Sequence, residues 1–340
     1  MKIKTVYIEI TNRCNLNCRT CYNRSGLNQK TQELSVLEIE QIMNTLSQCG
    51  ANRFLFSGGE PSLHSHFHEL LDMTKRYPQY SYGFVTNGTN DDPVWIEYLN
   101  NHSNLTLQIS LDGATEEQNR LTRGKGNFEK AITFVKRIKN PNLKPLLKMV
   151  ISQSNLAGVE DFYHLALSIG CIPEYAFIYR SGNGSDDWES KTLSTNQKIQ
   201  VMKQIEKLNQ TYKTDAFFPK CTVKCPFASP SGEEALSLCI KTDGSIQPCQ
   251  TLYDARFTLA NALDFQEEIF MQNLQTILFT AQKRATTDFG CNKCMLKSVC
   301  GRGCMAEAFL LTADPLGDDQ NCLYRKIQFL SFDLKRQQNS

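Results

Sequence analysis

Strong net charge is missing from this chain of 340 residues. Its formal charge is only +2, and no run of basic residues is interleaved with aromatic ones. Such a chain presents no strong field to nucleic acid or to an anionic membrane, so we expect neither as a partner. Internal repeats and low-complexity tracts are missing as well. The 41% of hydrophobic residues suffices for a sizeable core, and the length favours one large domain with a smaller appendage.

Long apolar runs are also missing. No run is long enough to span a bilayer, and the first residues, Met1–Lys4, lead into a strand-like segment and not into the apolar core of a secretory signal. We therefore expect a cytoplasmic protein. Disulfides explain its fourteen cysteines poorly, because a reducing cytosol keeps thiols free, and the cysteine content favours metal binding.

Segments with the patterns of strands and helices alternate through the first half of the chain. Strands are expected at residues 5–11, 53–57, 80–86, 105–111, 146–151 and 175–179. Helices are expected at 35–50, 66–77, a short stretch from 92, 127–138 and 159–169. Strands separated by helices pair in parallel, which predicts an α/β fold, either an open doubly wound sheet or a partial barrel.

Three cysteines follow the first expected strand at C-x3-C-x2-C spacing: Cys14, Cys18 and Cys21. A structural zinc site normally has four closed ligands. Three clustered thiols are better matched to an iron–sulfur cluster that keeps one iron open to a further ligand. A zinc knuckle or scattered structural thiols are the alternatives.

Polar and glycine-rich turns follow the next expected strands. They are Ser57-Gly58-Gly59-Glu60-Pro61, Thr86-Asn87-Gly88 and Ser110-Leu111-Asp112-Gly113. Ligands of parallel α/β folds bind at the carboxyl ends of the strands, which is where these turns lie. Two adjacent glycines let a backbone approach a ligand closely, and a glutamate can accept a hydrogen bond from an ammonium group. Each turn by itself is also an ordinary connection.

In this order the motifs resemble those of the radical S-adenosylmethionine (SAM) enzymes, which implies a partial (β/α)6 barrel. In that family the open iron of a [4Fe–4S] cluster chelates SAM, and reduction releases a 5′-deoxyadenosyl radical. The resemblance assigns the cluster to Cys14, Cys18 and Cys21. It assigns SAM contacts to Gly58, Gly59 and Glu60 at the amino group, Ser110 and Arg123 near the carboxylate, Thr20 at the adenine through its backbone, and Asn155. A solvated surface charge is the alternative for Arg123, and a helix cap or an Asx turn is the alternative for Asn155.

A second group of cysteines lies in the last third of the chain. It comprises Cys221, Cys225, Cys249, Cys291, Cys294, Cys300, Cys304 and Cys322. Four of them are spaced closely enough for a zinc site. Together with Gly244-x4-Cys249, the group resembles the SPASM extension of peptide-modifying radical SAM enzymes, which holds two auxiliary [4Fe–4S] clusters.

The family's ligand sharing would assign Cys221, Cys225, Cys249 and Cys304 to the first auxiliary cluster, with Cys239 as the alternative to the early pair. It would assign Cys291, Cys294, Cys300 and Cys322 to the second. The remaining cysteines, Cys49, Cys171 and Cys239, are expected to be small buried residues, with a redox role as the alternative.

The resemblance divides the chain into three parts. Residues 1–185 would form the radical SAM partial barrel, 186–215 a bridging helix and linker, and 216–340 a small SPASM domain with its iron–sulfur clusters. We expect an enzyme with three [4Fe–4S] clusters and SAM that abstracts hydrogen from a residue of a ribosomally made peptide, giving a cross-link, oxidation or epimerisation. An external electron donor of flavodoxin or ferredoxin type is implied. The alternatives are a sulfatase-maturase-like oxidation, dehydrogenation of a small molecule, or a non-catalytic iron–sulfur or zinc binding module.

Two details refine this expectation. Sulfatase-maturing relatives carry an aspartate that can act as the base directly after the cysteine that corresponds to Cys249. This chain has Gln250 there, which cannot accept a proton. We therefore expect no sulfatase maturation, unless Asp254 takes that place. Because the chain begins at its first expected strand, we also expect no winged-helix leader-binding domain. A peptide would then be held by the barrel and SPASM surfaces or delivered by a separate protein.

Overall fold

The computed structural model describes residues 3–26, 30–218, 225–228, 235–287, 291 and 293–327. Its strands form one sheet in the order β6-β5-β4-β3-β2-β1-β7-β8-β9. The bounds are β1 (Ile3–Thr11), β2 (Arg53–Gly58), β3 (Ser81–Thr86), β4 (Leu105–Ser110), β5 (Leu146–Ile151), β6 (Ile172–Phe177), β7 (Leu236–Ile240), β8 (Ser245–Gln247) and β9 (Ala260–Asn261). Neighbours from β6 through β1 to β7 pair in parallel, and β8 and β9 are added antiparallel. The predicted α/β class is confirmed.

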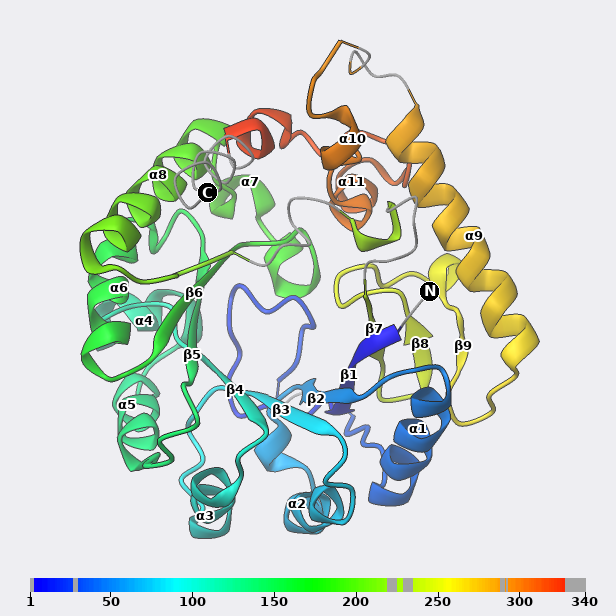
Figure 1. Cartoon of the computed structure of the whole chain (residues 1–340). Helices are drawn as coiled ribbons and strands as arrows, with labels where there is room; N and C mark the ends of the chain where they lie inside the picture. The colour runs from blue at the N-terminus through cyan, green and yellow to red at the C-terminus, as the bar shows by residue number, and fades with distance from the viewer. Residues whose placement is uncertain are drawn as a thin grey trace.

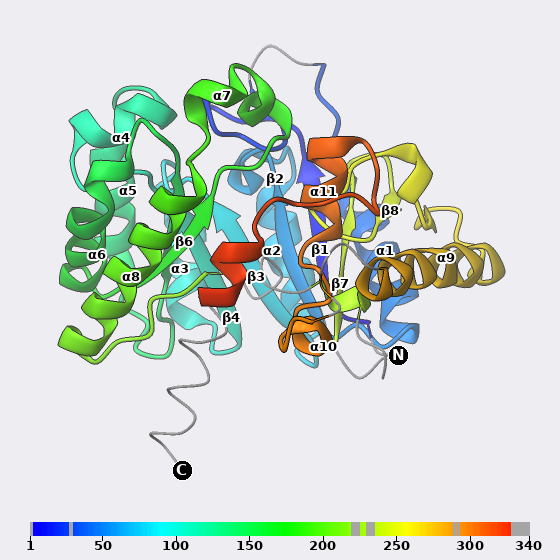
Figure 2. The ribbon, with the colours of Figure 1, turned by 90° about the horizontal axis from the view of Figure 1, so that it is seen from above.

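Helices cover the outside of the curved sheet, and the loop that follows β1 lies within the curve (Figure 1). The helices are α1 (Val36–Gln48), α2 (Phe67–Arg76), α3 (Pro93–Asn101), α4 (Glu116–Arg123), α5 (Phe128–Arg137), α6 (Val159–Ser168), α7 (Trp188–Lys191), α8 (Thr195–Tyr212), α9 (Glu267–Thr286), α10 (Lys297–Cys300) and α11 (Met305–Thr312). Figure 2 shows helix α7 and the loop that follows β1 at the same end of the sheet, away from the start of β1.

The side chains of strand β1 show how the two faces of the sheet differ. Val6, Ile8 and Ile10 are buried in the hydrophobic core shared with the helices. Because successive side chains of a strand point to opposite faces, Glu9 and Thr11 face the other, concave side of the sheet. The outer face is therefore an apolar core, and the inner face carries polar groups.

Two local expectations differ from the structure. Helix α4 was not predicted, because most of its residues are polar and charged and it offers no apolar stripe; Thr115 caps its first turn. The sixth strand was expected at 175–179 but spans Ile172–Phe177 and includes Pro173. Proline is tolerated there because β6 is the last strand at its edge of the sheet, bridged on its outer side at Glu174 by Phe217.

The later part of the chain extends the same sheet, because β7 pairs with β1 along Ile3–Ile8. The three-part division at residues 185 and 215 stays a prediction. Among the described helices, none combines the length and the apolar character that a membrane crossing requires.

Candidate active site

The cysteine loop, residues 12–34, connects β1 to α1 and is anchored at several points. Its ends are joined by hydrogen bonds from Asn12 N to Gln32 O (3.0 Å) and from Leu34 N to Ile10 O (3.0 Å). Asn183 clamps its middle, donating from its backbone to Cys21 O (2.8 Å) and from its side chain to Cys18 O (2.9 Å). The loop that carries the three cysteines is therefore held in a defined position at the carboxyl ends of the strands.

The sulfur atoms of this loop have the surroundings of an anionic metal centre. Burial raises the pKa of Cys14 to about 12 and that of Cys18 to about 11. These thiols would stay protonated in the absence of a metal, and thiolate coordination would deprotonate them. Asn87 Nδ2 lies 4.0 Å from Cys14 Sγ, and Arg123 Nη1 lies 3.9 Å from Cys18 Sγ.

Within the part of the chain that the structure describes, no three His, Cys, Asp or Glu side chains converge as ligands of a single metal ion. A [4Fe–4S] cluster binds each cysteine to a different iron and so needs its thiolates further apart than a single ion does. Three thiols on one loop are the donor set that a cluster with one open iron requires, so the cysteine loop fits such a cluster.

The two glycines at the end of β2, Gly58 and Gly59, pack directly against the cysteine loop. Gly59 N donates to Thr11 O and Glu60 N donates to Arg13 O, both at 2.7 Å. An ideal Cβ at Gly58 would lie 2.3 Å from Thr11 O, and one at Gly59 would lie 2.0 Å from Arg13 O. Any larger residue would push the loop away. The glycine pair thus has a packing reason in addition to the predicted approach to SAM.

Glu60 joins the ends of β2 and β3. Its buried carboxylate accepts hydrogen bonds from Ser62 Oγ and Thr86 Oγ1 at Oε1 and from Asn87 N at Oε2, each at 2.7 Å. Burial raises its pKa, and these hydrogen bonds oppose the rise. Oε2 keeps capacity for another donor such as an ammonium group, and that contact stays a prediction.

Arg123 lies at the end of α4 and is buried, so the alternative of a solvated surface charge is wrong. Its Nε lies 2.9 Å from Asp112 Oδ2, and the Asp112 side chain is completely buried. Asp112 also accepts from Thr122 Oγ1 (2.8 Å) and from Val150 N (2.9 Å). This network places a fixed positive charge beside Cys18 and joins α4 to the ends of β4 and β5.

The other predicted SAM contacts lie at the same end of the sheet. The buried Asn155 donates to Asp112 O (3.1 Å) and Val150 O (3.0 Å), so its amide ties strand ends together. Ser110 ends β4 and is partly exposed, and Thr20 is buried within the cysteine loop. The structure thus brings these three residues towards one edge, and their contacts to SAM stay predictions.

An ion pair that the sequence analysis did not predict lies on the concave face, between the buried Glu9 and the partly buried Lys241. Glu9 Oε2 lies 2.6 Å from Lys241 Nζ, and Glu9 Oε1 accepts from Tyr253 Oη at 2.5 Å. Asn23 of the cysteine loop donates to the same carboxylate at 3.0 Å, and Tyr22 stacks on Tyr253. The alternation of apolar residues in β1 isolates Glu9 on the inner face, and that was the signal available in the sequence. This network joins the cysteine loop to β7 and to the loop after Cys249.

The late cysteines fall into two neighbourhoods, with Cys221 outside the described residues. Burial and then the Cys249 charge raise the pKa of Cys225 to about 11, and the backbone N–H of Met305, next to Cys304, donates to the Cys225 sulfur. In the second neighbourhood, burial and then the charges of Cys291 and Cys300 raise the pKa of Cys322.

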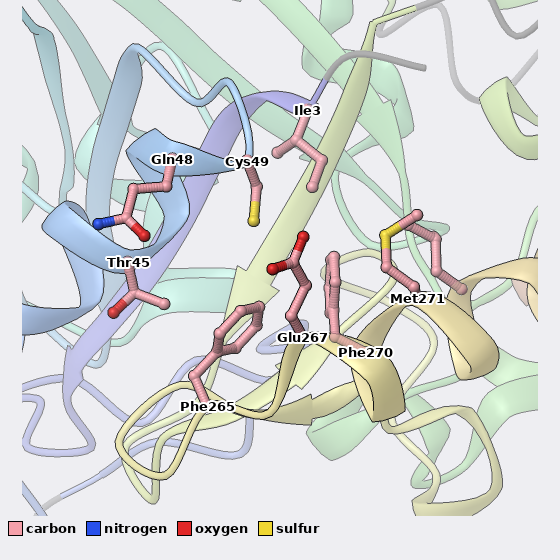
Figure 3. A pocket seen from close by; sticks show the side chains of 9 residues that line it. Ile3, Thr45, Gln48, Cys49, Phe265, Glu267, Phe270 and Met271 are labelled. Carbon is pink, nitrogen blue, oxygen red and sulfur yellow. The ribbon is translucent and has the colours of Figure 1, made fainter.

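Cys294 is partly buried, and its backbone N–H donates to Cys291 O at 2.9 Å. The three further cysteines differ among themselves. Cys171 and Cys239 are buried, and Cys239 belongs to the Glu9 network through its 3.8 Å approach to Glu9 Oε1. Cys49 lies outside this site, in a cavity of about 300 Å³ between α1 and α9 (Figure 3). Burial and the nearby Glu267 charge raise the pKa of Cys49, so this thiol is not activated there.

A parallel sheet whose first strand leads into a three-cysteine loop is the arrangement predicted for a radical SAM domain. Residues 8–166 match the family model described as the radical SAM superfamily, so the chain contains a radical SAM domain and the predicted family is confirmed. This family implies one [4Fe–4S] cluster and SAM as cofactors.

Relatives of known name agree with this. The chain is 27% identical over 328 residues to the mycofactocin maturase MftC of Mycolicibacterium smegmatis, covering 93% of this chain and 81% of the relative. Among solved structures it resembles Streptococcus suis SuiB bound to its precursor peptide SuiA, with a TM-score of 0.75 and 14% identity over 94% of this chain and 76% of SuiB. It also resembles anSMEcpe with bound AdoMet, with a TM-score of 0.75 and 17% identity over 98% of each chain. These structures support the partial-barrel fold.

Proposed function

We propose that this protein is a radical SAM peptide maturase that abstracts hydrogen from one residue of a ribosomally made peptide. The alignment with a named maturase over 93% of this chain and 81% of the relative carries the proposal. The fold that the chain shares with SuiB, which was solved with its precursor peptide bound, supports it. The outcome at the peptide is a cross-link, an oxidation or an epimerisation.

In this proposal the bound cluster and SAM supply the 5′-deoxyadenosyl radical. Cys14, Cys18 and Cys21 hold the cluster. The turn at Gly58–Glu60 receives the amino group of SAM. Arg123 places its guanidinium beside the carboxylate and the cluster, where its charge is compensated by Asp112 and offsets the anionic thiolates.

The concave face would hold the peptide. It carries a second ion pair, between Lys148 Nζ and Glu174 Oε1 at 2.9 Å, across β5 and β6. The Glu9–Lys241 pair joins β1 to β7, four strands further along the sheet from β5. Together they give the inner surface fixed polar groups that can orient a peptide and limit access of water to the radical.

We include two auxiliary [4Fe–4S] clusters in the proposal. The proximity of Cys225, Cys249 and the start of α11 supports a first cluster, and that of Cys291, Cys300 and Cys322 supports a second. Their assigned ligand sets are Cys221, Cys225, Cys249 and Cys304, and Cys291, Cys294, Cys300 and Cys322. The external electron donor of flavodoxin or ferredoxin type and the cytoplasmic location also remain part of the proposal.

Reductive cleavage of SAM tests whether Cys14, Cys18 and Cys21 hold the cluster that binds it. The triple variant Cys14→Ala, Cys18→Ala, Cys21→Ala, reconstituted anaerobically, should no longer convert SAM to methionine and 5′-deoxyadenosine under reduction. Cys171→Ala, which removes a buried cysteine of the outer core, is the matched control and should retain cleavage. Wild-type cleavage by the triple variant would refute the proposal.

The peptide substrate is tested separately. Short reading frames beside the gene would be synthesised as peptides and incubated with the reconstituted enzyme, SAM and reductant. A SAM-dependent mass change confined to one peptide is the expected result. Cleavage of SAM without modification of any such peptide would favour a small-molecule substrate.

A further inference from the structure

Buried charged side chains gather at the four-cysteine run, among them Arg302, which is 6% exposed. Arg284 is 1% exposed, Arg325 is 3% exposed, and Asp319 is fully buried. Arg325 Nη1 forms an ion pair with Asp319 Oδ2, and Arg284 Nη2 lies 4.0 Å from the same oxygen. Arg302 and the Glu307 carboxylate interact with the same group, so three guanidinium groups face two carboxylates and positive charge is in excess.

Arg284 is only partly satisfied by protein groups. Its Nη1 donates to the carbonyl oxygens of Arg302 (2.5 Å), Gly303 (3.4 Å) and Gly301 (3.5 Å). Its Nε and Nη2 are buried and have no hydrogen-bond acceptor among residues 3–26, 30–218, 225–228, 235–287, 291 and 293–327. A buried guanidinium without acceptors is costly, and an anion beside it removes that cost. A four-iron cluster with four thiolate ligands is such an anion.

Arg325 contacts a predicted cluster ligand directly. Its Nε donates to Cys300 Sγ at 3.2 Å while its Nη1 stays paired with Asp319. The neighbouring Gly303 has φ +78°, and a Cβ there would lie 2.2 Å from Arg325 Nη1 and 2.3 Å from Asp319 Oδ2. Only glycine leaves room for the pair at this distance. The chain is thus built to hold Arg325 against the Cys300 sulfur.

We propose that Arg325 raises the reduction potential of the second auxiliary cluster through its N–H···S hydrogen bond to Cys300. This rests on the auxiliary clusters of the proposed function. Reduction adds one negative charge to a cluster, so a hydrogen-bond donor and a buried cation stabilise the reduced form more than the oxidised form. A higher potential suits a cluster that accepts one electron during substrate oxidation.

The test is a redox titration of the reconstituted full-length enzyme followed by EPR, repeated with the cysteine-loop triple alanine variant to isolate the auxiliary signals. Arg325→Met removes both the charge and the donor. The reduction equilibrium of one auxiliary cluster should change at least tenfold. For a one-electron step this lowers its midpoint potential by about 59 mV or more. Arg325→Lys keeps the charge and should give a smaller shift in the same direction.

Arg256→Lys is the matched control, because Arg256 is an exposed arginine paired with Asp254 and should leave every midpoint unchanged. If Arg325→Met fails to assemble the cluster, Arg325→Lys still decides, since a midpoint equal to that of the wild type would overturn the inference. An unchanged midpoint with full iron content refutes this inference alone. A wild-type content of about four irons per chain would refute the auxiliary clusters and this inference with them.

Discussion

Replacing Gly59 by alanine tests whether the end of β2 must touch the cysteine loop. An ideal Cβ at Gly59 would lie 2.0 Å from Arg13 O, and Cβ contacts under 3.0 Å are essentially never found. The two backbones must therefore separate by about 1 Å, the difference between these values. That stretches the 2.7 Å hydrogen bond from Glu60 N to Arg13 O to about 3.7 Å, outside hydrogen-bonding range.

The cost of Gly59→Ala follows from these contacts. Forcing an extra carbon into a packed site costs about 1–3 kcal/mol, and each of the two backbone hydrogen bonds contributes about 0.5–1.5 kcal/mol. In total, the native position of the loop that holds Cys14 is destabilised by about 2–6 kcal/mol. Since about 1.4 kcal/mol corresponds to a factor of ten, we expect reductive cleavage of SAM to fall at least tenfold. Product analysis by chromatography and the EPR signal of the reduced cluster measure the effect.

Gly26→Ala is the matched control within the same loop. Its Cβ would meet Asn17 Oδ1 at 3.8 Å and Leu16 O at 4.0 Å, which are ordinary contacts. This variant should keep the cluster and the activity. Wild-type cleavage in Gly59→Ala would show that the close contact has no part in holding the loop. Equal losses in both variants would also refute the reasoning, because the effect would not follow the contact.

Three further outcomes are expected. Lys241→Met should destabilise the fold by about 3–5 kcal/mol, because it leaves the buried Glu9 carboxylate without its cation. Glu9→Gln should cost less, because Lys241 is partly exposed and also donates to Asn23 Oδ1, and the double variant should recover most of the loss of Lys241→Met in thermal unfolding; additive losses would contradict the pairing. Iron and sulfide analysis after anaerobic reconstitution should give about twelve irons per chain, whereas stoichiometric zinc with a single cluster would contradict the auxiliary sites. A peptide with a sulfatase Cys/Ser-x-Pro-x-Arg motif should not be converted to formylglycine, because Gln250 is neutral and the hydrogen bonds from Arg256 lower the pKa of Asp254 to about 2, which makes it a weak base. Efficient conversion that is lost in Asp254→Ala, read by mass spectrometry, would reverse that expectation.

The parts of the site that could be predicted are those with short sequence spacing. Cys14, Cys18 and Cys21 lie on one loop, and Gly58–Glu60 follows the next strand, so their placement depends mainly on strand-to-loop order. Helix α1 was predictable for a similar reason, since Ser35 and Glu38 form the capping box that its sequence indicates. Local signals of this kind survive folding because the interactions are made within a few residues.

Helix α4 and the burial of Arg123 could not be predicted from local sequence signals. The helix is too polar to reveal itself by periodicity, and its last residue becomes buried only because Asp112, at the end of β4, is folded against it. The same holds for Glu9, whose partner Tyr253 is 244 residues away in the chain. No local pattern distinguishes a buried ion pair from a solvated charge, because burial depends on which distant segments pack together.

The amino-acid sequence by itself determined the class of this protein, through the cysteine spacing, the order of strands and turns, and the alternation that requires a parallel sheet. Only the tertiary structure decided that Glu60 and Asn155 tie strand ends together, that Arg123 lies against Cys18, and that Arg325 donates to Cys300. The physical reason is that thiols and glycines act through the backbone that carries them. The effect of a charged or amide side chain depends instead on its burial and on partners that the fold brings to it.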